Sequence, residues 1–344
     1  MERAEGGALT RSQLMRPAAV VATAAVSVAF GYFAVRGIKF SSTWQALGAC
    51  NYWWLVPSLG ALAASVLVRV IRWQSLFSPT RRPPLQSLTK ATIIGFFFNS
   101  ILPARAGEIA RIVALKKYAG TSAAETTATV VVERLFDVAS LIVLLFALLA
   151  WLPHVSWLEP AAIVAFVCLA AVLALIFFGR LAPDRPRPLV TRLLARIPGL
   201  HEETISRMIG NVVHGLATLG RPRQALAVLG WTFLSWFLLG LSFWFLMIGF
   251  DLGLSPLAGL LVVIATGLAF IIPAAPAAVG VFEAAGLAVT SAYGIPRSHA
   301  LAYVLVLHVL NFAPFIVAGL LILATDARSS RVSTVSGARL RSRG

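Results

Sequence analysis

Long apolar runs separated by short basic segments make up most of this chain. Six of the runs approach the roughly 20 apolar residues that an α-helix needs to cross the hydrocarbon core of a bilayer. They cover residues 17–35, 52–71, 130–151, 160–178, 225–248 and 299–324. The pattern therefore predicts an all-α polytopic membrane protein with about six full transmembrane helices.

The composition agrees with a membrane protein. Hydrophobic residues make up 59% of the 344 residues and charged residues only 12%, which is too apolar for a soluble domain. The net charge of +16 lies in blocks between the apolar runs, as in cytoplasmic loops, so it does not indicate a nucleic-acid partner. Cys50 and Cys168 lie beside or within apolar runs and predict neither a disulfide framework nor a metal site. We expect no cofactor.

The distribution of lysine and arginine predicts a hairpin at "LPARAG". If residues 86–102 formed an ordinary span, the arginine-rich linker 179–223 would face outward, against the positive-inside rule. A broken hairpin with arms 86–102 and 104–118, entering from the cytoplasm and returning to it, removes the conflict. It leaves 25 of the 29 lysines and arginines on the inside. Both termini are then cytoplasmic, in a protein of the cell (plasma) membrane.

The second half of the chain repeats this pattern in the opposite orientation. A second break, "IPAAPAAVGVFE", again places proline and glycine before a glutamate. Each half thus consists of two spans, a broken hairpin and a further span, as in inverted-topology repeats. Alternatively, proline and glycine only kink helices of full depth here, and charge counting does not separate the two readings. The expected break residues are Asn99, Pro103, Gly107, Pro273, Pro276 and Gly280.

These patterns also predict the division of the chain. An N-terminal cytoplasmic arm covers residues 1–16, a membrane domain covers 17–325, and a basic cytoplasmic tail, expected to be unstructured, covers 326–344. The membrane domain divides into repeats at 17–155 and 156–325. Its linker 179–223 is expected to carry an amphipathic helix on the cytoplasmic surface, because apolar residues recur on one stripe.

Charged residues within membrane segments are rare and tend to be functional. In the first hairpin, Arg105, Glu108 and Arg111 are three residues apart, so they share a face if 104–118 is helical. A guanidinium suits a lipid phosphate. We therefore list them as candidate headgroup ligands, together with Arg72, which with Trp73 otherwise reads as an interfacial anchor.

Glu133, Arg134 and Asp137 form a second charge group in the next span. Arg134 and Asp137 are spaced to pair, whereas Glu133 and Asp137 repel each other unless a cation lies between them. Arg105 or Arg111 of the hairpin is the expected cation. The group is interpreted as a structural network, which leaves open whether its arginine partners also face a ligand.

In the second half, Glu283 is an isolated carboxylate after the break. It is read equally as a headgroup contact, a proton-coupling site or a helix cap. Gly280 is expected to permit a tight turn or close approach. His308 and Asn311 share a helix face, and His308 is expected to bond between helices. The sequence has no G-x-x-x-x-G-K-[ST], H-E-x-x-H or G-x-S-x-G motif, and we expect no catalytic residue.

Four segments resemble the lysylphosphatidylglycerol synthase transmembrane-domain family, also called flippase-like or UPF0104 proteins. They are "NSILPARAGEIARIVAL", "ETTATVVVERLFDVASLIVLL", "PAAPAAVGVFEAA" and "HVLNFAPFIVAGLL". The resemblance covers about residues 20–325 and implies movement of lipid between leaflets. The family pattern falls on Asn99, Pro103, Arg105, Gly107, Glu108, Arg111, Glu133, Arg134, Asp137, Pro273, Gly280 and Glu283. The sequence departs from it in "PAAPAAVG", where members often have a glycine-rich "PGGLG". The aminoacyltransferase domain of the best-known members does not follow in this chain, so lysyl transfer is not expected.

We therefore expect a flippase-like protein that moves an amphipathic lipid or lipid-linked substrate. Its expected partners are membrane lipids with anionic or phosphate-bearing headgroups, and lipid-biosynthetic enzymes are further candidates. One alternative is an enzyme or accessory subunit in glycolipid, polyprenyl-phosphate or hopanoid biosynthesis. Another is a scaffold that recruits enzymes through the basic linker and tail.

Overall fold

The computed structural model describes most of the membrane domain. The described residues are 24–32, 35–38, 40–102, 105–148, 163, 166, 167, 170, 222–270 and 275–341. Their regular structure is helical throughout, and no strand occurs among them. The arm 1–16, Pro103, Pro273, nearly all of the run 160–178 and the predicted linker helix lie outside the described residues.

Three helices are long and apolar enough to cross a membrane. They lie within residues 52–75, 223–249 and 297–328 and coincide with three of the predicted runs. The first contains the short 3-10 helix η1 (Tyr52–Trp54) and α3 (Leu55–Ser75), and the others belong to α10 (Pro222–Gly249) and α13 (Arg297–Arg341). A fourth helix, α6 (Ala123–Leu148), is 26 residues long, but it carries four charged side chains, three of them within residues 133–137.

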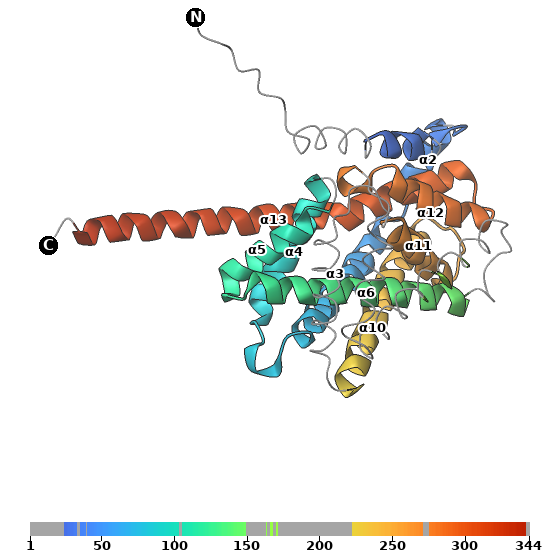
Figure 1. Cartoon of the computed structure of the whole chain (residues 1–344). Helices are drawn as coiled ribbons and strands as arrows, with labels where there is room; N and C mark the ends of the chain where they lie inside the picture. The colour runs from blue at the N-terminus through green and yellow to red at the C-terminus, as the bar shows by residue number, and fades with distance from the viewer. Residues whose placement is uncertain are drawn as a thin grey trace, which may run out of the picture.

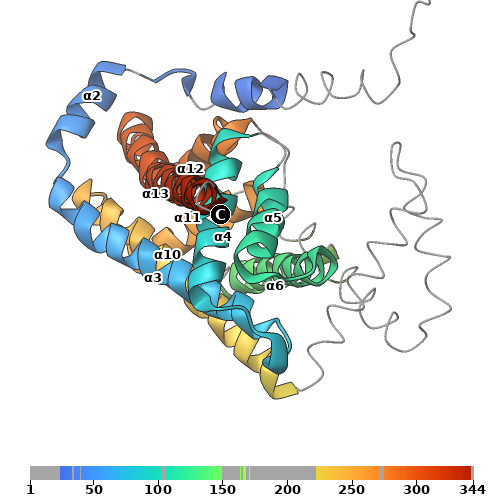
Figure 2. The same ribbon diagram turned by 90° about the vertical axis from the view of Figure 1, so that its left-hand side faces the viewer.

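The first predicted hairpin is present. After the 3-10 turn η2 (Pro79–Arg81), α4 (Leu85–Ile101) and α5 (Gly107–Ala119) lie side by side, as Figure 2 shows in cyan and green. At a rise of 1.5 Å per residue they are about 26 and 20 Å long, shorter than the roughly 30 Å hydrocarbon core. A Cβ atom on Gly107 would lie 2.0 Å from the carbonyl oxygen of Gly95. Glycine at this crossing therefore lets the two arms touch.

The second break is also present. The arms α11 (Pro256–Ala269) and α12 (Val281–Ala292) pack together and are separated by the 3-10 turn η4 (Pro276–Ala278). Gly280 adopts a φ of +86°, and a Cβ atom there would lie 2.2 Å from the carbonyl oxygen of Ser27. The amide of Ala275 donates to Ser27 Oγ at 2.8 Å. Both expectations for Gly280, a turn and a close approach, are confirmed.

The helices α3 and α10 form the longest pairing in the bundle and run side by side in Figure 2. Ser58 donates to the carbonyl oxygen of Ser242 at 2.6 Å, and Ser65 donates to that of Ser235 at 2.8 Å. The second contact lies seven residues from the first on each helix. The small serine side chains let the two backbones approach, as is common between membrane helices.

Two features differ from the sequence predictions (Figure 1). A short helix, α2 (Phe40–Ala49), lies between the predicted runs 17–35 and 52–71, where no helix was predicted. At the other end, α13 projects from the bundle as a helix to Arg341, so the expectation of an unstructured tail is wrong. Because nucleation is the costly step in helix formation, a helix already formed by an apolar span extends into polar sequence at little cost.

The buried apolar side chains form two groups. One gathers around α10, α11, α12 and α13, and the other around α4, α5 and the ends of α3 and α6 that face them. Along α6, Glu133, Arg134 and Asp137 lie between Val132 of the second group and Leu141 of the first.

Candidate functional site

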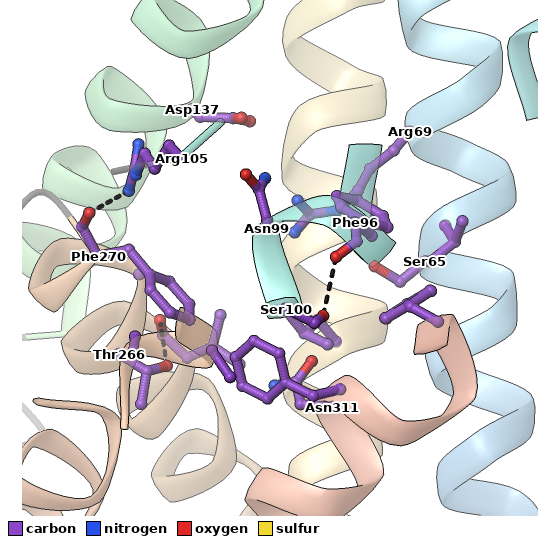
Figure 3. Close-up of a pocket in the computed structure, with 18 of the residues that line it drawn as sticks. Ser65, Arg69, Phe96, Asn99, Ser100, Arg105, Asp137, Thr266, Phe270 and Asn311 are labelled. Carbon is purple, nitrogen blue, oxygen red and sulfur yellow. Dashed lines mark hydrogen bonds between the residues drawn. The ribbon is translucent and has the colours of Figure 1, made fainter. Parts of the chain in front are cut away.

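A cavity of about 400 Å³ lies between the two broken hairpins. Its lining combines polar and apolar side chains, which alternate around the cavity (Figure 3). The polar side chains are Arg69, Asn99, Arg105, Glu108, Arg134, Asp137 and Asn311. The apolar side chains include Phe96, Leu239, Phe243, Val263, Phe270, Phe312 and Phe315. Such a lining suits a ligand with a charged end and an apolar body.

Beside the cavity, a buried charge network is centred on Glu133 of α6. Its carboxylate contacts Arg72 at 3.0 Å, Arg111 at 2.9 Å and Arg134 at 3.0 Å. The side chain of Glu133 is only 2% exposed. Three cations around one buried carboxylate fix the relative positions of α3, α5 and α6, because each charge needs its partner in a dry setting.

Asp137 joins the same network one turn along α6. It contacts Arg134 at 3.3 Å, which confirms the predicted pair, and Arg72 at 2.5 Å. Arg72 and Arg134 thus each contact both Glu133 and Asp137, whereas Arg105 or Arg111 was expected as the cation between them. Arg111 does pair with Glu133. Helix spacing gives the partners within α6, whereas the contribution of α3 depends on tertiary packing.

Arg72 and Trp73 are completely buried, so the interpretation of this pair as an interfacial anchor is wrong. Arg72 also donates to Thr232 of α10 at 3.1 Å. The guanidinium of Arg111 lies over the Trp73 ring, 3.4 Å from its centroid. Neither arginine lines the cavity, which places both in the network rather than at the ligand surface.

Arg105 reaches across the cavity from one break to the other. It precedes α5 in a left-handed conformation with a φ of +56°, so it does not share a helix face with Glu108 and Arg111 as the spacing suggested. Its Nη2 donates to the carbonyl oxygen of Phe270, which ends α11 (Figure 3). Glu108 contacts Arg134 at 3.6 Å and orients it toward the cavity.

Arg69 was not identified from the sequence. It lines the cavity one turn before Arg72, with its guanidinium 4.3 Å from the centre of the Trp236 ring. Trp236 in turn donates to Ser140 Oγ at 3.0 Å. The sequence signal that could have identified Arg69 is its position within an apolar span, three residues before Arg72. Within the described part of the chain, neither Arg69 nor Arg105 forms an ion pair with a carboxylate.

Glu283 lies away from the cavity wall and is held twice. Its Oε2 accepts from the amide of Gly280 at 2.7 Å, so it acts as the helix cap that was one of three readings. Its Oε1 lies 2.6 Å from Nδ1 of His308 on α13, which confirms the interhelical role expected for His308. Asn311, one turn further, faces the cavity.

Among the break residues, Asn99 and Pro276 lie where the sequence predicted. The Oδ1 atom of Asn99 accepts from the amide of Gly107 at 2.9 Å, so the end of one arm holds the start of the next. Pro276 opens the turn η4, where its missing N–H is not needed.

Comparison with known proteins gives two matches. The model of the lysylphosphatidylglycerol synthase TM region matches residues 20–319. A UPF0104 membrane protein of Methanocaldococcus jannaschii is 27% identical over 226 residues, which cover 65% of this chain and 91% of that protein. Both matches are to membrane proteins, and the residues matched by the family model include both hairpins and the cavity.

Proposed function

The chain belongs to the family of lysylphosphatidylglycerol synthase TM regions, and we propose that it moves an amphipathic lipid, or a lipid-linked substrate, with an anionic headgroup between leaflets. The observation that carries this function is the cavity between the hairpins, whose lining combines arginines with aromatic side chains. Such a cavity within the bilayer accommodates a headgroup and shields it from the hydrocarbon core, while the apolar side chains meet the acyl chains.

The headgroup is expected to lie between Arg69 and Arg105. Both guanidinium groups lack a carboxylate partner among the described residues. A phosphate can replace the Phe270 carbonyl as the acceptor for Arg105 and gain a charged hydrogen bond of about 1.5–3 kcal/mol. Arg134 is one-third exposed and can add a third contact, whereas Arg72 and Arg111 hold the frame.

The order of the helices supports a finer architecture. Helices α3 to α6 and α10 to α13 each consist of a long helix, two short arms and a further long helix. In our proposal these are inverted-topology repeats, with about six full spans and two re-entrant hairpins whose breaks meet near the midplane. Both termini then face the cytoplasm of a cell whose plasma membrane holds the protein.

Leaflet exchange in proteoliposomes tests this function. The measurement follows a labelled phosphatidylglycerol with wild type, Arg69→Ala and Arg105→Ala. Each variant is expected to lower headgroup affinity roughly ten- to a hundredfold, since each removes one charged hydrogen bond. Lys116→Ala is the matched control, because Lys116 is exposed on α5 outside the cavity.

The outcomes separate the alternatives. Exchange that is absent with folded wild type, or that is unchanged in both arginine variants, contradicts lipid movement through this cavity. Chemical conversion of an added lipid by purified protein would instead favour an enzyme. Loss of cellular function on deletion of 326–344, with the arginine variants active, would favour a scaffold.

A further inference from the structure

A carboxylate–imidazole pair lies between α12 and α13, separate from the charge network. Oε1 of Glu283 and Nδ1 of His308 are 2.6 Å apart, and the two side chains are 11% and 15% exposed. Both sit in strongly apolar helices, where ionisable groups are expensive and often carry protons. The pair is thus buried enough to be sensitive to its charge and exposed enough for a proton to reach it.

Among the residues that the structure describes, the ion pair of Glu283 is with His308. The packed helices α2 and α11 carry no ionisable side chain. The other neighbouring elements have ionisable side chains, which lie near the ends of helices or are bonded to other groups. They are Tyr32 in 24–32, Lys90 on α4, Arg223 on α10, Tyr293 after α12, and Arg297, His299, Tyr303, Asp326 and Arg328 on α13. Tyr303, the nearest along α13, donates to the carbonyl oxygen of Phe243.

The pair is connected to the cavity from both of its members. Glu283 caps Gly280, and Ala277 and Ala278 of the same break line the cavity. The His308 ring lies 4.6 Å from the ring of Phe312, which also lines the cavity. A change in the charge of the pair therefore acts on the break through the cap and on the apolar lining through the ring.

We infer that Glu283 and His308 form a proton-binding site that couples lipid movement to a transmembrane proton gradient. This rests on the proposed function and adds its energy source. A proton from water on one side binds the pair, the contact between carboxylate and imidazole changes, and the break at Gly280 shifts against the cavity. The same proton leaves to water on the other side, so no other reactant is required.

The transport test uses proteoliposomes with a fluorescent phosphatidylglycerol, with and without an imposed pH gradient. Exchange without a gradient tests the proposed function alone. A gradient of one pH unit corresponds to the free energy of a tenfold concentration ratio. In wild type, such a gradient is expected to shift the leaflet ratio of the probe at least about threefold, which corresponds to roughly half of that free energy. In Glu283→Gln the ratio with and without gradient is expected to be equal, whatever its basal rate. Glutamine retains the cap, because its side-chain oxygen accepts from the Gly280 amide, but does not titrate.

A second readout does not depend on transport. Infrared titration of the purified protein is expected to show a carboxylate band that shifts as the pair binds a proton and that is lost in Glu283→Gln. In His308→Gln this shift is expected to change, because the imidazole partner is gone. Absence of a shifting band overturns the site. Exchange in wild type that ignores the gradient overturns the coupling and leaves the proposed function intact, and a titrating band without any exchange overturns both.

Discussion

The backbone amide of Gly107 donates to Oδ1 of Asn99 at 2.9 Å, so the last turn of α4 holds the first turn of α5. The chain can reverse here because a side-chain amide replaces the carbonyl that a continuous helix would have offered. Gly107 also touches the backbone of Gly95. One close contact thus sets both the position of the break and the distance between the arms.

Replacing Gly107 with alanine should disrupt this contact. The new Cβ atom would lie 2.0 Å from the Gly95 carbonyl oxygen, and backbone atoms on both sides leave little room to adjust. We expect a loss of at least about 2–3 kcal/mol of folding free energy, as for overpacked cores. Thermal unfolding in detergent measures it.

Gly60→Ala is the matched control, because a Cβ atom there, in the second turn of α3, meets nothing within 4 Å. It should leave stability unchanged or raise it by roughly 0.5–1 kcal/mol. Equal unfolding temperatures for Gly107→Ala and wild type would show that the arms do not touch as described.

Glu133→Gln should destabilise the protein rather than change its ligand affinity. The substitution leaves Arg72 and Arg111 facing a neutral group in a buried site, and removing one partner of a buried ion pair typically costs about 3–5 kcal/mol. The expected result is poor recovery of monodisperse protein in size-exclusion chromatography. Glu125→Gln on the same helix, outside the network, should behave as wild type. A stable Glu133→Gln protein would contradict the central role of this carboxylate.

The sequence was informative where the signal is local. Proline, glycine and the basic segments predicted the first hairpin, and helix spacing predicted the contact of Arg134 with Asp137. It was not informative where two distant helices meet. Arg72 resembles an anchor in its own helix because α3 ends there, and only the packing of α3 on α6 buries it.

Arg105 shows a second limit. Three-residue spacing places it with Glu108 and Arg111 only if the helix includes it, but α5 begins two residues later, at Gly107, and the backbone is left-handed at Arg105. The end of a helix next to proline is uncertain by a few residues in any sequence reading. That uncertainty changes the role of Arg105 from a helix-face residue to a link between the breaks.

The first hairpin should return to the side from which it enters. In a chain without Cys50 and Cys168, single cysteines at Thr80 and Ser122 flank the hairpin at exposed or partly exposed positions. Both should react with a membrane-impermeant thiol reagent only from the cytoplasmic side. A cysteine at Ser41 of α2 should react only from outside. Labelling of Ser122→Cys and Thr80→Cys from opposite sides would show that α4 and α5 do not form a re-entrant hairpin.

Arg69 and Arg72 lie one turn apart on α3 and should respond differently to substitution. Arg69 stacks on Trp236 and faces the cavity without a carboxylate partner among the described residues, so Arg69→Ala should fold normally. It should bind a short-chain phosphatidylglycerol roughly ten- to a hundredfold more weakly, the loss of one charged hydrogen bond. Isothermal titration calorimetry of purified protein in detergent measures this affinity.

Arg72→Ala should instead reduce the yield of folded protein, because it leaves Glu133 and Asp137 four residues apart with less positive charge between them. Arg81→Ala is the control for general attraction of anionic lipid to the basic surface, because Arg81 of η2 is exposed. This variant should change the affinity for the lipid less than twofold, as expected for a screened surface charge. If Arg69→Ala binds the lipid as tightly as Arg81→Ala does, the unpaired arginine is structural and the headgroup lies elsewhere. The expected result is that Arg69→Ala folds but binds the lipid weakly, while Arg72→Ala fails to fold. Arg69 then binds the ligand, and Arg72, one turn further along α3, holds the helices in place.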